Sequence, residues 1–440
     1  MTGYCVSDIA AITGGVLSGD GAAPVTGAVI DSRAVTPGAL FAAIPGERVD
    51  GHDYIGKAFD LGASCCLAQR VPAGETRPVI CVPDTAAALE TLARAYRARF
   101  AIPVLGVTGS VGKTTAKEMV ASVLSQRWNT LKTEKNFNNQ LGVPLTLFRL
   151  EPEHQAAVVE MGVSHVGDMA PLAAMVQPTA MLFTIIGHAH LEFLRDRRGV
   201  LQEKTSVLDT MPDDAVAFCN GDDDLLRAMT CRQRKVTFGL SDGCDVRAVD
   251  VRDLGDGGST CTIVAGARRI PVRIRAYGQH MVYAALEGAA VGIEYGLTDD
   301  EIIRGIAAYQ PVGSRANVVR TARYTVIDDC YNANPDSTAG RVAILGNMGE
   351  LGPDAAALHR ETGVCAAKAG VSLVITCGAL AREIAAGAAE ADPSVQTASF
   401  AALDELLAAL PELVQPGDCV LVKASHSMAF ERIVQALTQN

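Results

Sequence analysis

The feature that most constrains the fold is an apolar run that stops at a glycine-rich turn and leads into a helix. The stretch reads VLGVTGSVGKTTAKEMVASVL, from Val104 to Leu124. Glycines let successive backbone N–H groups turn toward one anion, and the helix N-terminus adds partial positive charge. Strand, turn, Lys-Thr and helix follow in the order that a phosphate-binding P-loop needs. The sequence therefore predicts a nucleotide phosphate site, formed by Gly109, Ser110, Val111, Gly112, Lys113, Thr114 and Thr115.

This motif departs from the strict G-x-x-x-x-G-K-[ST] pattern at one position, because Val107 stands where the first glycine belongs. In such a loop Lys113 reaches the β- and γ-phosphates, and the Thr114 hydroxyl can bind Mg²⁺. A glycine-rich turn with a surface lysine is the alternative interpretation. ATP binding alone leaves hydrolase, kinase and ligase open.

After residue 100, apolar strand-like runs alternate with helical stretches. Such alternation is typical of parallel sheets covered by helices. The first hundred residues instead carry short strand-like runs with frequent Gly and Pro, and a closing helix that Asp84 can cap. A chain of 440 residues has room for about three domains. We therefore expect an α/β protein with a small N-terminal α/β domain (1–100), a central P-loop parallel-sheet domain (101–311) and a C-terminal Rossmann-like domain (312–440).

Charge and cysteine usage narrow the class of partner. The net charge of −11 argues against a nucleic-acid partner, which would favour a basic face. The twelve cysteines include the adjacent pair Cys65 and Cys66 and form no C-x-x-C, so we interpret them as thiols of a reducing compartment. The N-terminus lacks a signal-type apolar run, and no segment is long and apolar enough to span a bilayer. We expect a cytoplasmic protein.

Two further strand ends carry side chains that could hold a cation. Glu160 ends the run AAVVE, and His188, His190 and Glu192 follow the apolar run AMLFTII. Ligands of open α/β sheets collect at the carboxyl ends of the strands. A carboxylate and an imidazole there could hold a divalent cation, whereas a solvated glutamate and a structural histidine are the alternative.

Several motifs in one order resemble the Mur ligases, and within that family the MurF branch. The resemblance covers nearly the whole chain. It rests on DSRAVTPGALFAAIPGERVDGHDYI, GVTGSVGKTTAKEM, KNFNNQLGVPLTL, VVEMGVSHVGDM, GHAHLEF, PVGSRANVV, DDCYNANPDS and VLVKASHSM. What it implies is an ATP-dependent amide ligase of peptidoglycan precursor synthesis. UDP-N-acetylmuramoyl-tripeptide would be phosphorylated on a carboxylate, and the amine of D-alanyl-D-alanine would attack the acyl phosphate.

The same resemblance implies how the charge of that reaction is offset. Lys113 and two Mg²⁺ ions would neutralise the meeting of a carboxylate with a phosphate. Thr114 would bind one metal ion, and Glu160 with His190 the other. Lys204 would be carbamylated, which replaces a cation that repels Mg²⁺ with an anionic oxygen ligand. Without the family, an ordinary surface lysine is the favoured interpretation of Lys204.

Substrate and nucleotide contacts follow from the resemblance as well. Near the uridine end of the substrate it places Asp31, Ser32 and Arg33, and in the substrate wall Asn136, Asn138 and Asn139. Taken alone, both stretches are ordinary turns. For ATP it adds His280, Arg315, Asp329, Tyr331, Asn332 and Asn334. Met281 and Ala284 stand where the family often has amides, and Ala284 removes a hydrogen-bonding group.

One departure from the family concerns the last domain. Only five residues, Asp336 to Gly340, separate Pro335 from the next strand, where the family carries a full helix. A crossover between parallel neighbours needs about a dozen residues or more. Either the two strands are not neighbours, or one face of the sheet is uncovered, or residues have been lost. An uncovered apolar strip would make this domain the least stable part, or would lead to dimerisation; otherwise we expect a monomer.

Three other functions stay open at this point. A ligase that adds the third amino acid also has a DSR region, but it usually carries an Asn-Pro-Arg motif that is missing here. A degenerate homologue could bind nucleotide without ligating. A P-loop kinase or transporter ATPase would explain the phosphate site but not the first and last domains.

Overall fold

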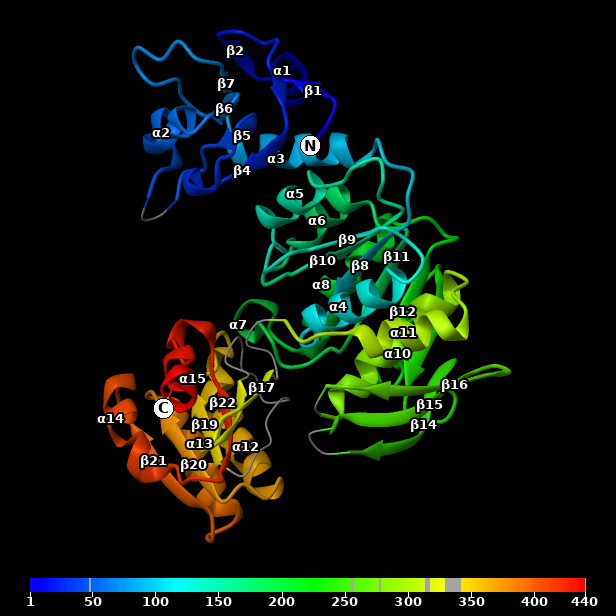
Figure 1. Ribbon diagram of the computed structural model, residues 1–440, viewed down its shortest axis with the longest axis vertical. Coiled ribbons are helices and arrows are strands. Elements are labelled where there is room, and N and C mark those ends of the chain that lie inside the picture. The colour runs from blue at the N-terminus through cyan, green and yellow to red at the C-terminus, as the bar shows by residue number, and fades with distance from the viewer. Residues whose placement is uncertain (47–48, 255–256, 277, 313–316, 329–341, 440) are drawn as a thin grey trace.

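A computed structural model describes residues 1–46, 49–254, 257–276, 278–312, 317–328 and 342–439. The chain forms three successive α/β units (Figure 1). In the N-terminal unit the described strands form a five-stranded sheet and a separate two-stranded one. The larger sheet has the order β2 (Val16–Ser18), β7 (Val79–Cys81), β6 (Cys65–Ala68), β5 (Ala39–Ala42) and β4 (Gly27–Val29), and the smaller pairs β1 (Tyr4–Cys5) with β3 (Pro24–Val25). Its helices are α1 (Val6–Thr13), α2 (Ile55–Asp60), α3 (Thr85–Arg97) and the short 3₁₀ turns η1 (Ser32–Ala34) and η2 (Gly51–Tyr54).

Helix α3 forms where the sequence predicts it, because the Asp84 carboxylate accepts hydrogen bonds from the N–H groups of Ala86 and Ala87. It packs against α1 of its own unit and against α5 and α6 of the central unit. Tyr96 of α3 is buried, and its hydroxyl donates a hydrogen bond to the carbonyl of Leu150 in the central unit at 2.7 Å. The first unit is therefore joined to the second by a shared apolar core.

The central unit contains a nine-stranded sheet within the described residues. Its order is β16 (Arg268–Ile274), β15 (Ser259–Ala265), β14 (Val246–Asp253), β13 (Arg234–Gly239), β12 (Val216–Asn220), β11 (Ala180–Phe183), β8 (Val104–Thr108), β10 (Ala156–Glu160) and β9 (Thr130–Lys132). From β9 to β14 the strands are parallel, as the alternation predicts. The helices are α4 (Lys113–Leu124), α5 (Gly142–Leu147), α6 (Met169–Val176), α7 (Leu191–Leu194), α8 (Arg197–Thr205), α9 (Asp224–Ala228), α10 (His280–Glu294) and α11 (Asp299–Ala308), with the 3₁₀ turn η3 (Ser206–Thr210).

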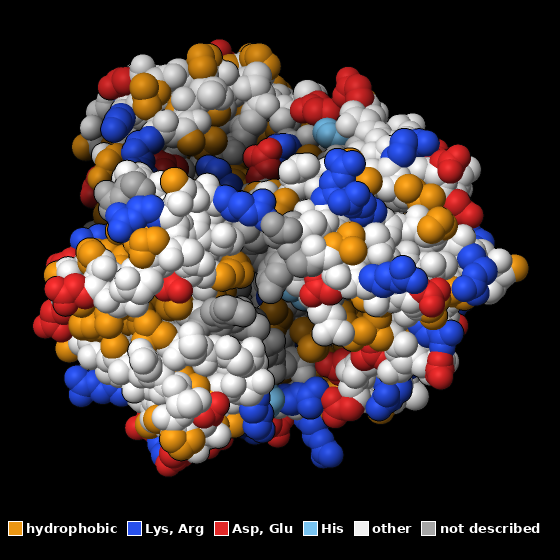
Figure 2. Space-filling view, turned by 60° about the horizontal axis from the view of Figure 1, so that its bottom comes forward, with side chains coloured by type: hydrophobic (Ala, Val, Ile, Leu, Met, Phe, Trp, Pro, Cys, Tyr) orange, Lys and Arg blue, Asp and Glu red, His pale blue; other side chains and the backbone are white. Residues whose placement is uncertain are grey.

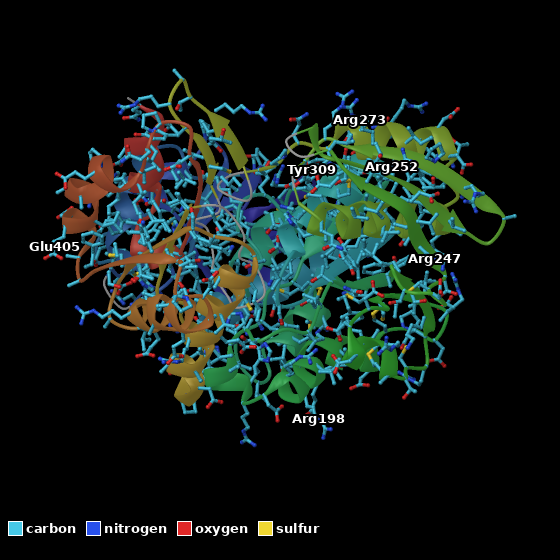
Figure 3. The ribbon with its side chains drawn as sticks, turned by 90° about the horizontal axis from the view of Figure 1, so that it is seen from below. Arg198, Arg247, Arg252, Arg273, Tyr309 and Glu405 are labelled. Carbon is cyan, nitrogen blue, oxygen red and sulfur yellow. The ribbon has the colours of Figure 1, made fainter. Side chains whose placement is uncertain are left out.

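The edge β14–β15–β16 is an antiparallel meander that the sequence analysis did not predict. A two-residue connection joins β15 to β16, and its Gly266 has a φ of +57°, the conformation such tight hairpins need. Figure 3 shows Arg247, Arg252 and Arg273 of these strands on the side of the central unit away from the last one. The phosphate motif, by contrast, follows β8, which lies between the parallel strands β11 and β10.

The last unit has a sheet with six described strands. Its order is β17 (Asn317–Arg320), β18 (Thr325–Asp328), β22 (Cys419–Lys423), β19 (Val342–Gly346), β20 (Leu373–Cys377) and β21 (Gln396–Phe400), all parallel except β17. Its helices are α12 (Ala355–Lys368), α13 (Ala381–Ala391), α14 (Leu403–Leu413) and α15 (Glu431–Thr438), with the 3₁₀ turns η5 (Gly352–Asp354) and η6 (His426–Met428).

This order resolves part of the short-crossover problem. Strand β22 lies between β18 and β19, so the two strands are not neighbours, and the first of the three alternatives is confirmed. Helices cover both faces, since α14 and α15 pack on one side of the sheet and α12 and α13 on the other. The short segment itself, 336–340, lies outside the described residues.

The expected apolar strip is not found among the residues whose exposure is described, 319–328 and 342–439. Within these ranges only Leu380 is a large hydrophobic side chain that is exposed, at 38%. The expectation of an uncovered face is therefore wrong for the described part of the sheet. An uncovered face therefore no longer explains why this domain should be the least stable, and its lower stability stays a prediction.

Candidate active site

The glycine-rich turn forms a tight nest at the carboxyl end of β8. Gly109 and Gly112 have φ values of +152° and +82°, and α4 begins directly afterwards at Lys113. A Cβ on Gly109 would lie 1.9 Å from the hydroxyl oxygen of Thr184, so only glycine fits. Ser110 donates its N–H to the carbonyl of Ile185 at 2.8 Å, which fixes the turn against the chain that follows β11. The predicted phosphate cradle is therefore present in shape.

Lys113 and Thr114, in the first turn of α4, have different hydrogen-bond partners. The Lys113 ammonium donates a hydrogen bond to the carbonyl of Gly109 at 2.8 Å and so lies across the loop. The Thr114 hydroxyl donates to the Oε2 atom of Glu160 at 2.9 Å. The cation therefore lies against the loop and the hydroxyl against the carboxylate that ends β10; that they bind phosphate and Mg²⁺ stays a prediction.

Glu160 ends β10 and is held on three sides. Its Oε2 accepts from Thr114, its Oε1 accepts from the side-chain amide of Asn138 at 2.8 Å, and its main-chain N–H donates to the hydroxyl of Thr133 at 3.0 Å. The side chain is only 2% exposed. A carboxylate and a hydroxyl in contact are oxygen ligands of the kind that Mg²⁺ prefers. The described residues contain no cluster of three or more His, Cys, Asp or Glu that could hold a metal. Mg²⁺ usually keeps several waters and phosphate oxygens, so the two oxygens fit that ion.

The asparagines of KNFNNQLG have different roles. Asn138 lies at the site because its side-chain amide donates a hydrogen bond to Glu160. Gly162 lies close to Asn138, since a Cβ on Gly162 would be 2.9 Å from the Asn138 side chain. Asn139 accepts a hydrogen bond from the N–H of Gly142 at 2.9 Å, at the start of α5. Asn136 contributes its carbonyl, which accepts the N–H of Asn138. The turn interpretation is therefore correct locally, and one of its members also reaches the carboxylate.

Lys204 lies on α8 with a side chain that is completely buried. Its amine has no hydrogen-bond partner among the described residues. Burial, followed by the charge of Lys113, holds the pKa of Lys204 well below its ordinary value. The surface interpretation of this lysine is wrong. A buried amine without an acceptor fits a group that is completed by something else, as a carbamate would be.

His190 lies at the start of α7 with a φ of +58°. Burial lowers the pKa of His190, and the nearby charges of Lys204 and Lys113 lower it further. The three side chains therefore lie within electrostatic reach of one another. The Nδ1 atom of His190 also contacts the carboxylate of Glu350 from the last unit.

Other candidates lie apart from this cluster or outside the described part. Asp31 caps η1 and pairs with Arg33, which lowers the pKa of Asp31 to about 2 and leaves the Arg33 side chain 81% exposed. Ser32 is buried. His280 is the exposed first residue of α10. The ATP candidates that fall outside the described residues are Arg315, Asp329, Tyr331, Asn332 and Asn334.

Met281 and Ala284 are each 2% exposed and pack in the apolar core between the central sheet and its helices. Their place is therefore explained by packing.

The sequence analysis missed a buried charge network one turn along α4. Lys117 is 1% exposed, donates to the carbonyl of Thr133 at 2.6 Å and pairs with Glu118 at 2.9 Å, and Glu118 also pairs with Lys132. Although burial opposes it, the hydrogen bonds from Lys132 and Lys117 keep the pKa of Glu118 below its usual value. The spacing Lys113 to Lys117 was the available signal, since residues four apart share a helix face.

Family models match most of the chain. The Mur ligase family catalytic domain matches residues 24–97, the Mur ligase middle domain residues 107–292, and the Mur ligase glutamate ligase domain residues 314–426. UDP-N-acetylmuramoyl-tripeptide–D-alanyl-D-alanine ligases are similar over almost their full length. The enzyme from Bacillus subtilis is 32% identical, covering 94% of both chains, and that from Escherichia coli 33% identical, covering 93% of both.

Solved structures agree with these relatives. A crystal structure of MurF from Acinetobacter baumannii superposes with a TM-score of 0.89 at 28% identity, covering 99% of both chains. The MurF ligase from Thermotoga maritima in complex with ADP gives a TM-score of 0.80 at 27% identity, covering 94% of this chain and 97% of that one. With three family models matched in order and full-length likeness in sequence and structure, the chain belongs to the MurF branch of the Mur ligase family.

Proposed function

We propose that this protein joins D-alanyl-D-alanine to UDP-N-acetylmuramoyl-tripeptide, using ATP, in the synthesis of the peptidoglycan precursor. The observation that carries the proposal is the contact of Thr114 with Glu160 directly beside the Lys113 nest. Full-length similarity to relatives named for this reaction supports the choice of substrates. The same similarity argues against a third-residue ligase, and against a kinase or transporter ATPase that would leave the outer domains unexplained.

The reaction needs two anions to meet, and the chain's residues oppose their repulsion. The N–H groups of the nest and the Lys113 ammonium would hold the β- and γ-phosphates of ATP. Thr114 would hold one Mg²⁺ ion, and Glu160 with His190 a second; the two ions would supply further positive charge where the phosphoryl group is transferred. Asn138 keeps the Glu160 carboxylate turned toward Thr114.

Two bond exchanges complete the reaction. A carboxylate oxygen of the tripeptide attacks the γ-phosphorus, a P–O bond forms, and the bond to ADP breaks. The free amine of D-alanyl-D-alanine then attacks the acyl carbon, an amide C–N bond forms, and inorganic phosphate leaves with the former carboxylate oxygen. The amine gives up its proton as the tetrahedral intermediate collapses. The Lys113 ammonium, which lies across the nest, would stay in contact with the phosphoryl group during its transfer.

We propose in addition that Lys204 is carbamylated. Carbon dioxide adds to the neutral amine, so that an N–C bond forms and a proton is released. The complete burial of the amine, its missing acceptor and its lowered pKa support this modification. The resulting anion would help hold the second Mg²⁺ ion together with Glu160 and His190.

The remaining contacts are proposals drawn from the family. Arg33 would meet the uridine end of the substrate, and Asn136 and Asn139 would line its path. His280 and the candidates outside the described residues would contact ATP. No helix among the described residues is long and apolar enough to cross a membrane. The free thiols of the described cysteines support a reducing, cytoplasmic setting. We propose a monomer with domain boundaries near residues 100 and 311.

Release of phosphate from ATP tests this function. We expect release, with matching formation of the UDP-linked pentapeptide, only when both UDP-N-acetylmuramoyl-tripeptide and D-alanyl-D-alanine are present. Lys113→Ala should lower turnover by a factor of at least about 10² with the fold intact, because it removes a preorganised charge from the phosphoryl group. Lys57→Ala, which removes an exposed lysine of α2, is the matched control and should keep full turnover. Phosphate release without D-alanyl-D-alanine, or none with both substrates, would refute the proposal.

A further inference from the structure

A side chain of the last unit reaches a candidate metal ligand of the central unit. The carboxylate of Glu350 contacts the Nδ1 atom of His190, although 160 residues separate them in the chain. Figure 1 shows α7, which follows His190, where the central and last units meet. Figure 2 shows a hollow near the middle of the surface in its view. No role was assigned above to Glu350, which lies in the NMGELG stretch after β19.

The contact is part of a close-packed junction. The N–H of Glu192 donates to the main-chain carbonyl of Glu350 at 3.3 Å. A Cβ on Gly352 would lie 3.2 Å from the Cα of Glu192, so the two segments approach closely. Leu351 is 3% exposed and belongs to the same apolar core as Leu191 and Leu194 of α7. The backbone at Glu350 is therefore placed by packing, and its side chain, which is 48% exposed, lies against His190 at the edge of this junction.

The last unit also holds this segment firmly from within. His359 donates through Nδ1 to the carbonyl of Ala355 at 2.6 Å and accepts the N–H of Met348 through Nε2 at 2.9 Å. The N–H of Gly349 donates to the hydroxyl of Ser425 at 3.0 Å. Both residues before Glu350 are thus anchored, and the position of Glu350 follows the position of the whole last unit.

The chemistry of this pairing fixes a tautomer. A carboxylate next to Nδ1 is an acceptor, so Nδ1 carries the hydrogen and Nε2 keeps its lone pair. Lys113 and Lys204 lie within electrostatic reach of the same ring. A histidine that binds a metal commonly donates its other ring N–H to a carboxylate, which orients the ring and raises its basicity.

We propose that Glu350 is a positioning residue: from the last unit it holds His190 as the Nδ1–H tautomer, so that Nε2 is offered to Mg²⁺ only while that unit is docked. This inference rests on the proposed function for the identity of the ion. It makes completion of the second cation site depend on domain position. Domain opening would then weaken the site.

Nitrogen NMR of the ¹⁵N-histidine-labelled full chain tests the tautomer without any turnover. Wild type should show His190, assigned by loss of its signals in His190→Gln, with Nδ1 protonated and Nε2 unprotonated. Glu350→Ala should move His190 to mixed tautomers or to the Nε2–H form. Glu350→Gln should keep the wild-type tautomer, because its amide oxygen still accepts. An Nε2–H tautomer in wild type, or no change in Glu350→Ala, would overturn the inference.

Binding of Mn²⁺ with a non-hydrolysable ATP analogue, followed by electron paramagnetic resonance, gives the second readout. Glu350→Ala should weaken the weaker Mn²⁺ site by on the order of 10- to 100-fold, the range for losing such an outer partner of a ligand. Glu350→Gln should recover part of that loss. The matched control, Asp354→Asn, removes one exposed charge from the same segment and should bind as wild type. Equal binding in Glu350→Ala and wild type would contradict the inference.

The two readouts separate this inference from the proposed function. A wild type that shows the expected tautomer and Mn²⁺ binding but no ligation would refute the function and keep the role of Glu350. Ligation by wild type, together with a His190 tautomer that is the same in Glu350→Ala, would support the function and refute the role of Glu350.

Discussion

At the scale of single residues, the site depends on side chains whose burial changes their chemistry. Glu160 is 2% exposed and Lys204 is completely buried, yet both are ionisable. Glu160 is compensated by two donors to its carboxylate, whereas the Lys204 amine has no partner among the described residues. Burying a polar group without a partner costs free energy. The proposed carbamylation would give this buried amine a partner and a role at the cation site.

This reasoning predicts how Lys204→Met changes stability in CO₂-free buffer. Burial lowers the pKa of Lys204 in the folded chain, so the unfolded chain binds more protons between the lowered pKa and the ordinary one. Wild-type stability should therefore rise with pH across that window, and Lys204→Met should lack this rise. At neutral pH the variant should be more stable than wild type, because it lacks the cost of burying an amine without a partner.

Denaturant unfolding at several pH values measures this difference, with the exposed Lys57→Met as the matched control that should leave the profile unchanged. ¹³C NMR after exposure to labelled CO₂ should show a carbamate in wild type and not in Lys204→Met. A less stable variant with the wild-type pH slope would contradict the account of this lysine.

At the scale of elements, the P-loop helix was predictable and its anchoring was not. The strand, turn and start of α4 follow from local sequence, because glycine conformations and helix signals act within a few residues. The ion pairs of Glu118 with Lys117 and Lys132 join α4 to β9. They could not be predicted, because the position of β9 depends on its parallel pairing with β10. Likewise, a count of residues could not show that β22 separates β18 from β19.

Lys117 of the buried charge network donates a hydrogen bond to the main-chain carbonyl of Thr133. The side chain of Thr133 gives a prediction at the scale of elements. Thr133→Val removes the hydroxyl that accepts the N–H of Glu160 and leaves a buried donor unpaired. We expect a loss of about 1–3 kcal/mol in the free energy of unfolding. The apparent affinity for Mg²⁺ should also fall, because Glu160 is no longer fixed at the end of β10.

Urea unfolding and Mg²⁺-dependence of turnover check both effects. Thr133→Ser keeps the hydroxyl and should restore Mg²⁺ affinity, even if the lost methyl group costs some stability. A Thr133→Val variant that loses stability but keeps wild-type Mg²⁺ affinity would show that the network stabilises the fold without positioning Glu160.

At the scale of the whole molecule, the three units are joined by cores that the sequence pattern did not indicate. Helix α3 of the first unit packs against α5 and α6 of the central unit. Leu351 of the last unit belongs to the same apolar core as Leu191 and Leu194 of α7. The resemblance to the family predicted the order of the units and their folds. It did not predict the His190–Glu350 contact, because residues so distant in sequence meet only through the relative placement of two domains. Such contacts allow domain position to act on the site.

The central claim is that a substrate carboxylate is phosphorylated at the Lys113 nest. Transfer of ¹⁸O tests it most directly, with both oxygens of the reacting tripeptide carboxylate labelled and the released phosphate analysed by mass spectrometry. The account predicts that each phosphate carries one ¹⁸O atom, because the acyl C–O bond breaks when the amine attacks. Phosphate without the label, released together with the ligated product, would show that no acyl phosphate forms and would contradict the account.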